Sequence, residues 1–345
     1  MKTVVPAVIL SIVVLVAAGL RPGPTILSTD ATDAIPLEEL KEKYRRPPTV
    51  PFPAHNAHTR EREALGKALF FDPRLSQSNA ASCATCHNPA LSWGDGRPLG
   101  VGFAGQSLAR RTPTLVNLAW TELLFWDGRA AGLEAQALQP IMSAKEMNQT
   151  LDQTIAKLQK VEGYRRLFEQ AYPGEGITGP TIAKALATFE RTLVSGPAPF
   201  DAWIAGSDDA ISASAARGFL VFNTRANCAA CHSGWNLSDG GFHDIGLPSG
   251  DRGRGALLPL RVMQHAFKTP TLRNVARRGP YMHDGSLATL WDVVEQYDRG
   301  GETRPSLSKE MRPLGLSTRD KADLVAFMET LTSAEPVIPA PELPR

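Results

Sequence analysis

The chain has 345 residues, enough for two ordinary domains, and its 43% hydrophobic and 21% charged residues are typical of a soluble globular protein. The formal net charge is only +2 and no basic run is longer than two residues, so the sequence has no electrostatic footprint for nucleic acid. We therefore expect no nucleic-acid partner.

The first 20 residues have the pattern of a secretory signal peptide. Lys2 is followed by an apolar run over residues 4–18 and by small residues before Arg21. The alternative is an uncleaved membrane anchor, because this run approaches the shortest length that spans a membrane. We expect the protein to associate with a membrane only if the segment is not cleaved. In both cases we expect the remainder to be exported to the periplasm. Residues 21–58 are rich in proline and are expected to be extended.

All four cysteines lie in two copies of a Cys-x-x-Cys-His motif, "CATCH" and "CAACH". A disulfide at this spacing does not explain the histidine that follows in both copies, and zinc binding would compete with oxidation of the thiols after export. The pattern is typical of c-type haem attachment, in which both thiols bond to the porphyrin and the histidine binds the iron. We predict two covalently bound haem c groups, with zinc or disulfides as the alternatives. The predicted attachment residues are Cys83, Cys86 and His87 for the first haem and Cys228, Cys231 and His232 for the second.

The chain contains an internal repeat around these motifs. The sequence "TPTLVN" at 112–117 returns as "TPTLRN" at 269–274, and an Asp-Gly pair begins ten residues beyond each asparagine. Apolar residues at intervals of three and four predict helices between and after the motifs. We predict an all-α fold of two cytochrome c-like haem domains related by internal duplication, with long loops. The domains are expected over 59–198 and 208–332, followed by a Pro-rich tail over 333–345.

The two haems are expected to differ at the sixth position of the iron. Between residues 88 and 126 there is no His, Met, Cys, Tyr or Lys, so the first candidate ligands are Met142 and Met147. Twenty-eight residues beyond the first threonine of each repeat stand Pro140 in one half and Tyr297 in the other. We therefore expect an open first haem and a capped second haem. The candidate caps of the second haem are Tyr297, Met263, Met282, His265 and His283.

The segments at 110–147 and 267–301, with both haem motifs, resemble the bacterial dihaem cytochrome c peroxidases and the related MauG-type enzymes. The resemblance covers about residues 59–332. It implies an N-terminal haem that meets hydrogen peroxide and a C-terminal haem that stores or relays electrons, with Trp126 between them. It also implies a distal pocket in which a carboxylate can move a proton between the two oxygens of peroxide. The matching pocket residues are Gln136, Pro140 and Glu146.

The sequence departs from the ordinary peroxidases of this family in two places. No histidine lies between His87 and His232, so the histidine that caps the first haem in many of those enzymes is missing. Tyr297 stands where they place a methionine, as in the MauG-type enzymes. A phenolate ligand stabilises ferric and higher oxidation states, whereas a thioether favours ferrous iron. The resemblance therefore implies an enzyme that reacts with peroxide while both haems are ferric.

Three functions stay open at this point. The first is a MauG-type peroxidase whose electron donor is a tryptophan of a partner protein, and the second is an ordinary peroxidase served by a small cytochrome c or a cupredoxin. The third is a dihaem electron carrier without enzymatic activity. Surface aromatic residues are candidate steps for electrons, with core packing as the alternative reading of each. They are Trp203, Trp235, Tyr281 and Trp291.

The resemblance also raises the question of a calcium ion between the domains. In the family it is held partly by backbone carbonyls, and the matching segment here implies Arg278 and Pro280. An asparagine that contributes in the family is replaced by Arg111. Because the positive charge of Arg111 disfavours a calcium ion beside it, the sequence leaves open whether calcium binds.

Overall fold

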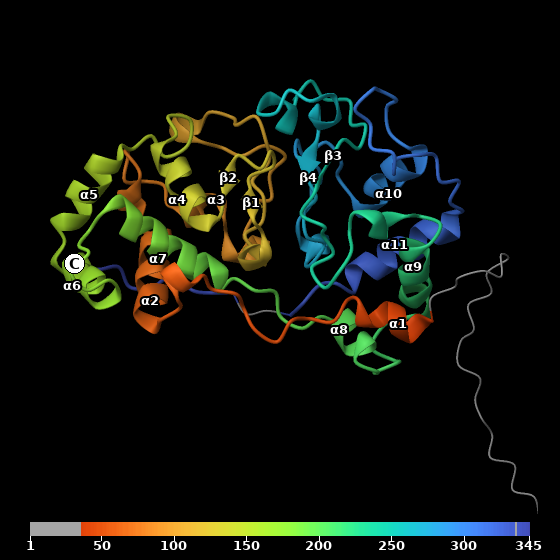
Figure 1. Ribbon diagram of the computed structural model, residues 1–345, viewed down its shortest axis with the longest axis horizontal. Helices are drawn as coiled ribbons and strands as arrows, with labels where there is room; N and C mark the ends of the chain where they lie inside the picture. The colour runs from red at the N-terminus through yellow and green to blue at the C-terminus, as the bar shows by residue number, and fades with distance from the viewer. Residues whose placement is uncertain (1–35, 335–336) are drawn as a thin grey trace, which may run out of the picture.

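The structure is a computed structural model that describes residues 36–334 and 337–345. The predicted signal peptide over residues 1–20 and the segment 21–35 lie outside the described residues. The described chain forms two helical lobes that meet along a seam (Figure 1). None of the helices in these ranges is long and apolar enough to cross a membrane.

The predicted all-α class is confirmed, because helices dominate both lobes. The described strands form only two pairs, and each strand has two residues. The first lobe contains α2 (Arg60–Phe71), α3 (Cys83–Cys86), β1 (Leu123–Leu124), β2 (Ala130–Ala131), α4 (Leu133–Met142), α5 (Leu151–Gln159), α6 (Glu162–Ala171) and α7 (Gly179–Arg191). The second lobe contains α8 (Pro199–Ile204), α9 (Ala213–Asn223), β3 (Phe242–His243), β4 (Phe267–Lys268), α10 (Leu290–Arg299) and α11 (Thr318–Glu329). Both strand pairs are antiparallel.

Each lobe is built on one closely crossing helix pair, α2 with α7 in the first lobe and α9 with α11 in the second. A glycine stands at each crossing. A Cβ at Gly66 of α2 would lie 2.0 Å from the carbonyl oxygen of Ala185, and a Cβ at Gly218 of α9 would lie 1.9 Å from that of Asp323. The backbones therefore approach each other at a distance that only glycine allows. The same device in both lobes agrees with the predicted duplication.

The repeated "TPTLxN" motif ends in an asparagine. In each lobe this asparagine makes two hydrogen bonds to the chain segment that follows the second helix of the pair. The backbone N–H of Asn117 donates to Leu193 O, and Asn117 Oδ1 accepts from the N–H of Ser195, at 2.8 and 2.9 Å. In the second lobe Asn274 makes the same two bonds to Leu331 O and from Ser333 N, at 3.0 and 2.9 Å. Both asparagines have a positive φ, a conformation that asparagine tolerates better than most residues. The repeat is therefore a structural equivalence as well as a sequence one.

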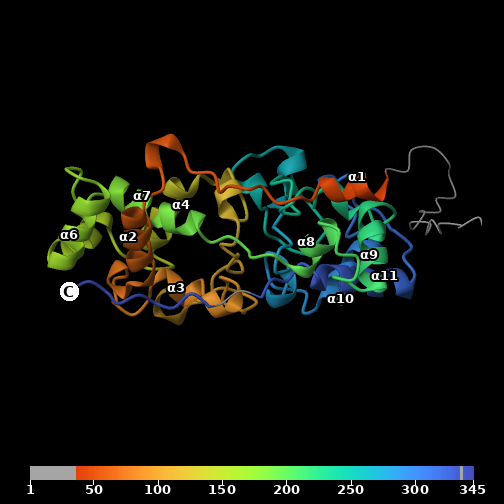
Figure 2. The ribbon, with the colours of Figure 1, turned by 90° about the horizontal axis from the view of Figure 1, so that it is seen from below.

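The two terminal segments cross between the lobes (Figure 2). The expectation of an extended segment over residues 21–58 is wrong for residues 37–42, which form α1 (Leu37–Glu42). The physical reason is burial: Leu40 and Tyr44 join the core of the second lobe, and Tyr44 Oη donates to Asn223 Oδ1 at 2.5 Å. The tail runs the other way, and Arg345 O accepts from the N–H of Gly163 on α6 at 2.8 Å.

Replacement of Gly66 by alanine tests the helix crossing. Because the added methyl group would collide with a backbone carbonyl, we expect Gly66→Ala to lower the free energy of unfolding by about 3 kcal/mol. Denaturant unfolding of the haem-loaded protein, followed by far-UV circular dichroism, measures the change. Gly250→Ala is the matched control, since no atom lies within 4 Å of a Cβ at that position. Equal unfolding midpoints for the two variants would contradict the close crossing.

Candidate functional site

A continuous cavity of about 1610 Å³ extends from one lobe into the other, and both Cys-x-x-Cys-His motifs line it. This volume exceeds the roughly 1,000 Å³ that bounds most pockets for one small ligand, so the cavity suits more than one bulky group. In the first lobe α3 and the residue after it present Cys83, Cys86 and His87. In the second lobe a short turn after α9 presents Cys228, Cys231 and His232.

The two motif histidines are held in the state that binds iron. His87 Nδ1 lies 3.0 Å from Trp93 O, and His232 Nδ1 lies 2.8 Å from Leu237 O. A carbonyl can only accept, so Nδ1 is the protonated nitrogen in both rings and Nε2 keeps its lone pair for a metal. Burial lowers the pKa of both histidines, which keeps the rings neutral. This donor set fits haem iron.

The backbone is bent to make these bonds. Trp93 has φ 61° and Leu237 has φ 48°, a left-handed conformation that costs a bulky residue on the order of 1 kcal/mol. Both residues are nevertheless buried in the cores of their lobes. The conformation aims each carbonyl at its histidine, and its recurrence in both lobes ties it to the shared site.

The cysteines agree with haem attachment better than with the alternatives. All four are free, so neither motif forms a disulfide. Among residues 36–334 and 337–345, the one group that could hold a metal ion joins Cys231 to Asp239 and His243 and contains neither motif's full Cys-Cys-His set. His243 Nε2 lies 2.8 Å from Asp239 Oδ2, and this carboxylate raises the pKa of the histidine to about 10. This group therefore does not correspond to the repeated Cys-x-x-Cys-His motif.

Buried cations on the cavity wall also fit haem. Burial lowers the pKa of Lys268 to about 8, and burial with the neighbouring Arg111 lowers the pKa of Arg278 to about 9. Neither residue has a carboxylate partner among the described residues, and both line the cavity. Unmatched buried charge is costly, and haem brings propionate carboxylates that could offset it. Lys268 and Arg278 are therefore suited to hold the propionate edge of a haem.

The predicted distal residues of the first haem all line its end of the cavity. Gln136 and Pro140 lie on α4, and Glu146 lies in the turn that follows, where its N–H donates to Ser143 O at 3.0 Å. Burial raises the pKa of Glu146, against the opposing effect of Arg129. Of the two methionines considered as ligands, Met142 is 48% exposed and does not line the cavity, whereas Met147 is buried and does.

One acidic residue at this end was missed by the sequence analysis. Glu190 on α7 is 5% exposed and lines the cavity, and its Oε2 has no hydrogen-bond partner. Burial raises its pKa to about 8. The only signal in the sequence was a glutamate within the apolar helical pattern of residues 181–193, which does not reveal on which side of the helix it is buried.

The second haem end offers Tyr297 from α10. Tyr297 lines the cavity, and burial with the nearby Cys228 and Cys231 raises its pKa above the ordinary tyrosine value. Met282 and His283 also line the cavity, but Met263 and His265 do not. His283 stacks on Phe267 with ring centroids 3.6 Å apart. Two methionines that the sequence analysis did not consider border the cavity as well, Met311 and Met328.

Trp126 lies at the seam between the two haem ends. Its indole Nε1 donates to Arg111 O at 2.8 Å, and its carbonyl accepts from the N–H of Lys268 at 2.8 Å. The N–H of Arg111 in turn donates to His283 O at 2.7 Å. The backbone of Trp126 is therefore bonded across the seam to Lys268, and its ring is held by Arg111, whose own N–H reaches His283 in the second lobe.

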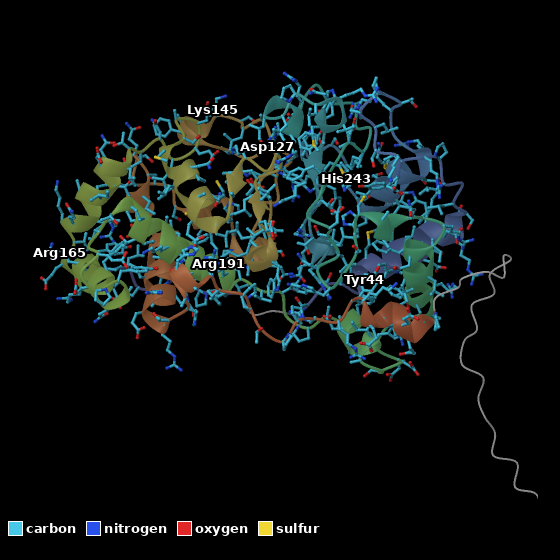
Figure 3. All side chains as sticks on the ribbon, viewed as in Figure 1. Tyr44, Asp127, Lys145, Arg165, Arg191 and His243 are labelled. Atoms are coloured by element: carbon cyan, nitrogen blue, oxygen red, sulfur yellow. The ribbon has the colours of Figure 1, made fainter. Side chains whose placement is uncertain are left out.

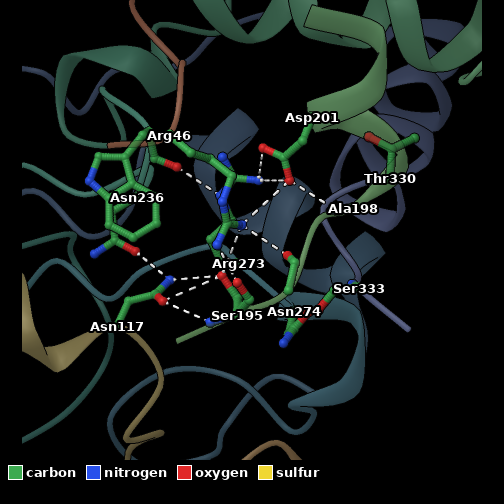
Figure 4. A network of polar contacts seen from close by, with 12 residues as sticks. Arg46, Asn117, Ser195, Ala198, Asp201, Asn236, Arg273, Asn274, Thr330 and Ser333 are labelled. Atoms are coloured by element: carbon green, nitrogen blue, oxygen red, sulfur yellow. Dashed lines mark hydrogen bonds and ion pairs between the residues drawn. The ribbon is translucent and has the colours of Figure 1, made fainter. Parts of the chain in front are cut away.

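Ion pairs lie next to these hydrogen bonds of Trp126 and Arg111. Asp127, labelled at the boundary of the lobes in Figure 3, pairs with Arg110 at 2.6 Å, and Arg110 pairs with Asp251 of the second lobe at 2.7 Å. A second polar network joins the lobes farther along the seam (Figure 4), where Asn117 Nδ2 donates to Asn236 Oδ1 at 3.0 Å. The lobes are thus held in one fixed relation around the cavity.

The residues at the expected calcium position do not fit a divalent cation. The guanidinium of Arg111 donates to Arg97 O and Gly279 O, each at 3.3 Å, so carbonyls that could bind a metal already accept from a cation. Arg278 is 8% exposed beside it. Two buried guanidinium groups repel Ca²⁺, which prefers several anionic or carbonyl oxygens. The nearest carboxylate, Asp95, already accepts from Thr112 Oγ1 at 2.8 Å.

Comparisons with known proteins agree with the site. Residues 60–209 match the family described as di-haem cytochrome c peroxidase, and residues 215–332 match the cytochrome c family. The chain is 52% identical over 326 residues to the methylamine utilization protein MauG of Methylorubrum extorquens, covering 93% of this chain and 92% of that one. It is 35% identical to the cytochrome c551 peroxidase of Pseudomonas aeruginosa, with 82% of each covered. A crystal structure of a MauG-like protein associated with microbial copper homeostasis superposes with a TM-score of 0.77 at 29% identity, covering 84% of this chain and 94% of that one.

The Arg111 geometry predicts that calcium has no role at the seam. We expect removal of calcium by EGTA to leave the haem absorption spectrum and the unfolding temperature of the purified protein unchanged. Calorimetric titration with CaCl₂ should show no site. Arg111→Gln should lower the unfolding temperature relative to Arg261→Gln, because Arg261 is exposed and Arg111 joins the lobes. Binding of one calcium ion per native chain would contradict the assignment.

Proposed function

The chain belongs to the family of di-haem cytochrome c peroxidases that includes MauG, and we propose that it reduces hydrogen peroxide to water at an open N-terminal haem, with electrons relayed through the C-terminal haem from a protein donor. As a member of this family it is a haem peroxidase with two covalently bound haem c groups. One observation supports the proposal: Pro140 and Tyr297 both line the cavity, and each is the eighth residue of a ten-residue helix, α4 or α10.

The N-terminal end suits proton transfer within peroxide. Haem bound at Cys83, Cys86 and His87 supplies an iron that binds peroxide and takes up its oxidising equivalents. Glu146 accepts a proton from one oxygen of hydrogen peroxide and returns it to the other, which leaves as water. A carboxyl with a raised pKa is suited to both steps, because its pKa is closer to the working pH and it can both bind and release the proton.

The neighbours of Glu146 have complementary tasks. Gln136 carries an amide that can donate to peroxide or to water and accept from either. Pro140 has no side-chain atom that can bind iron, so it keeps the sixth position free for the substrate. Both lie on α4, and this helix is held by its contacts with α7. The pocket is therefore positioned by regular secondary structure.

The C-terminal end suits the storage of oxidising equivalents. Tyr297 is the residue that we propose as the sixth ligand there, and a phenolate favours ferric and higher oxidation states. Trp126 offers the route between the two ends, because it lines the cavity and its indole N–H is held by Arg111 O at the seam. The methionines that border the same cavity, Met311 and Met328, are the competing ligands.

The donor is proposed to be a protein that docks near the second haem. Trp291 is 38% exposed on α10, the helix that carries Tyr297, whereas Trp203 is 4% exposed and packs in the core. The core-packing reading therefore holds for Trp203 and fails for Trp291. Relatives from Methylorubrum extorquens and Methylophilus methylotrophus, both 52% identical, are named methylamine utilization proteins, which supports a protein substrate of MauG type.

Export is part of the proposal. Residues 1–20 have the pattern of a signal peptide, and covalent haem attachment at Cys-x-x-Cys-His motifs belongs with a chain that leaves the cytoplasm. We place the enzyme in the periplasm, where a small cytochrome c or a cupredoxin could serve as an alternative donor.

Addition of stoichiometric hydrogen peroxide to the diferric protein tests the proposed function. Because neither a capping histidine nor another side chain of the first loop blocks the first iron, we expect reaction without prior reduction. Absorption and electron paramagnetic resonance spectra should show one high-spin and one low-spin haem at rest and a change in both after peroxide. Reaction of only the half-reduced protein would favour an ordinary peroxidase, and two low-spin signals at rest would favour an electron carrier.

Glu146→Gln tests the proton-transfer role. The amide cannot accept and return a proton, so we expect the rate of reaction with peroxide to fall by about 10²-fold or more while haem content is unchanged. In the native protein the rate should also fall as the pH drops through the raised pKa of Glu146, because the base form is lost. Stopped-flow absorption measures both. Glu162→Gln on the exposed surface of α6 is the control, and an equal rate in the two variants removes Glu146 from the mechanism.

A further inference from the structure

Glu190 is a buried acid that the peroxide chemistry does not use. It lies in the last turn of α7, is 5% exposed and lines the first-haem end of the cavity. Its Oε2 is fully enclosed and has no hydrogen-bond partner in the part of the chain that the structure describes. It also acts electrostatically on Cys83, the first thiol of the haem attachment motif. An unpartnered carboxyl therefore stands beside the place where the porphyrin is tethered.

The surroundings keep this carboxyl neutral. Arg191, the cation that acts on Glu190 among the described residues, donates from both terminal nitrogens to Glu134 on α4, at 2.7 and 2.8 Å. Glu134 itself adds negative charge near Glu190. Glu190 also stands at the C-terminal end of its helix, where the peptide dipoles disfavour an anion. Burial is the largest of these effects and raises the pKa of Glu190 to about 8.

Among the described residues, helix α2, which also packs on α7, adds no charge that acts on Glu190. α2 meets α7 through Gly66, which lies against Ala185, and through Phe70, whose ring contacts Phe189 at 5.2 Å between centroids. The groups that face Glu190 are therefore Cys83 from α3, Glu134 from α4 and Arg191 from its own helix. Since haem attachment converts the Cys83 thiol to an uncharged thioether, the bound iron becomes the charge that changes near Glu190.

We propose that Glu190 is a proton-binding site coupled to oxidation of the N-terminal haem. While the iron is ferrous, the carboxyl keeps its proton. When an external acceptor, in the test below the electrode, takes one electron from the bound ferrous haem, the O–H bond of Glu190 would break and the proton would leave for solvent, so the net charge of the buried site would be unchanged. This coupling is favourable because a low-dielectric interior penalises an uncompensated change of charge. It rests on the bound haem and not on the peroxide reaction.

The coupling fixes the pH dependence of the reduction potential. Glu190 would have one pKa while the haem is ferrous and a lower one while it is ferric. Between these two values oxidation releases the proton of Glu190, so the reduction potential falls as pH rises. Well below this window both forms are protonated, and the potential is flat. The same linkage would lower the potential of the N-terminal haem on the alkaline side and leave the C-terminal haem unaffected.

Spectroelectrochemical titration of the haem-loaded protein tests the proposal. It is repeated from about two pH units below to about two above the Glu190 pKa of about 8. In the native protein we expect the potential of the N-terminal haem to fall with a slope approaching one proton per electron. In Glu190→Gln the slope should vanish in this window, and the two curves should coincide at the acidic end and diverge at the alkaline end. Parallel curves would overturn the proposal.

Three further variants separate this site from others. Glu190→Asp keeps a carboxyl and should retain a pH-dependent potential. Glu146→Gln removes the other buried acid at this end and should leave the Glu190 slope in place, and Glu162→Gln should behave as the native protein. Loss of the slope in Glu146→Gln instead of Glu190→Gln would assign the proton to Glu146 and overturn the proposal.

A measurement on unaltered Glu190 covers the case in which Glu190→Gln does not fold. Redox-difference infrared spectroscopy of the native protein and of Glu146→Gln should show the carbonyl band of a protonated carboxylic acid that disappears on oxidation. Absence of this band in both proteins would show that no buried acid loses its proton with the electron. No peroxide is added in any of these experiments, so their outcome is independent of the proposed peroxidase reaction.

Discussion

The whole site depends on one hydrogen bond made twice, from the Nδ1–H of a motif histidine to a backbone carbonyl. Because Trp93 O and Leu237 O accept these bonds, His87 and His232 are fixed as neutral rings with Nε2 free. A haem bound at either motif would take its iron ligand from this nitrogen. Residues of α4 in one lobe and of α10 in the other line the same cavity and would supply the remaining wall of each haem site.

The duplicated scaffold explains how one chain can hold two cofactors with different tasks. Glycine crossings at Gly66 and Gly218 and asparagine clamps at Asn117 and Asn274 repeat with matching geometry, so both lobes deliver their haem motif in the same way. The difference lies in a single side chain on the distal helix. A proline cannot bind iron and a tyrosine can, so under the proposed function Pro140 and Tyr297 would divide the roles of the two haems without any change in the fold.

The sequence could predict what depends on spacing. The haem motifs, the repeat and the register that pairs Pro140 with Tyr297 are all offsets along the chain, and the structure places these residues on one cavity. The features that the sequence could not predict depend on which residues are buried and on which groups become hydrogen-bond partners in the fold. The role of Arg111 follows from carbonyls 14 residues before it and in the other lobe, at Arg97 and Gly279. Helix α1 was missed because a short segment among prolines gains its stability from the core of the second lobe and not from its own pattern.

The distribution of buried charge gives the two ends of the cavity different characters. The first-haem end carries two acids, the half-buried Glu146 and the buried Glu190, and Arg191 beside Glu190 is already paired with Glu134. The seam carries two cations, the half-buried Lys268 and the buried Arg278, which have no carboxylate partner among the described residues. Acids that can lose protons lower the cost of adding positive charge to the nearby iron, whereas fixed cations raise that cost and attract propionates. Proton chemistry is therefore favoured at one end and a fixed cofactor orientation at the other, and this separation suits the division between a peroxide site and an electron-transfer site.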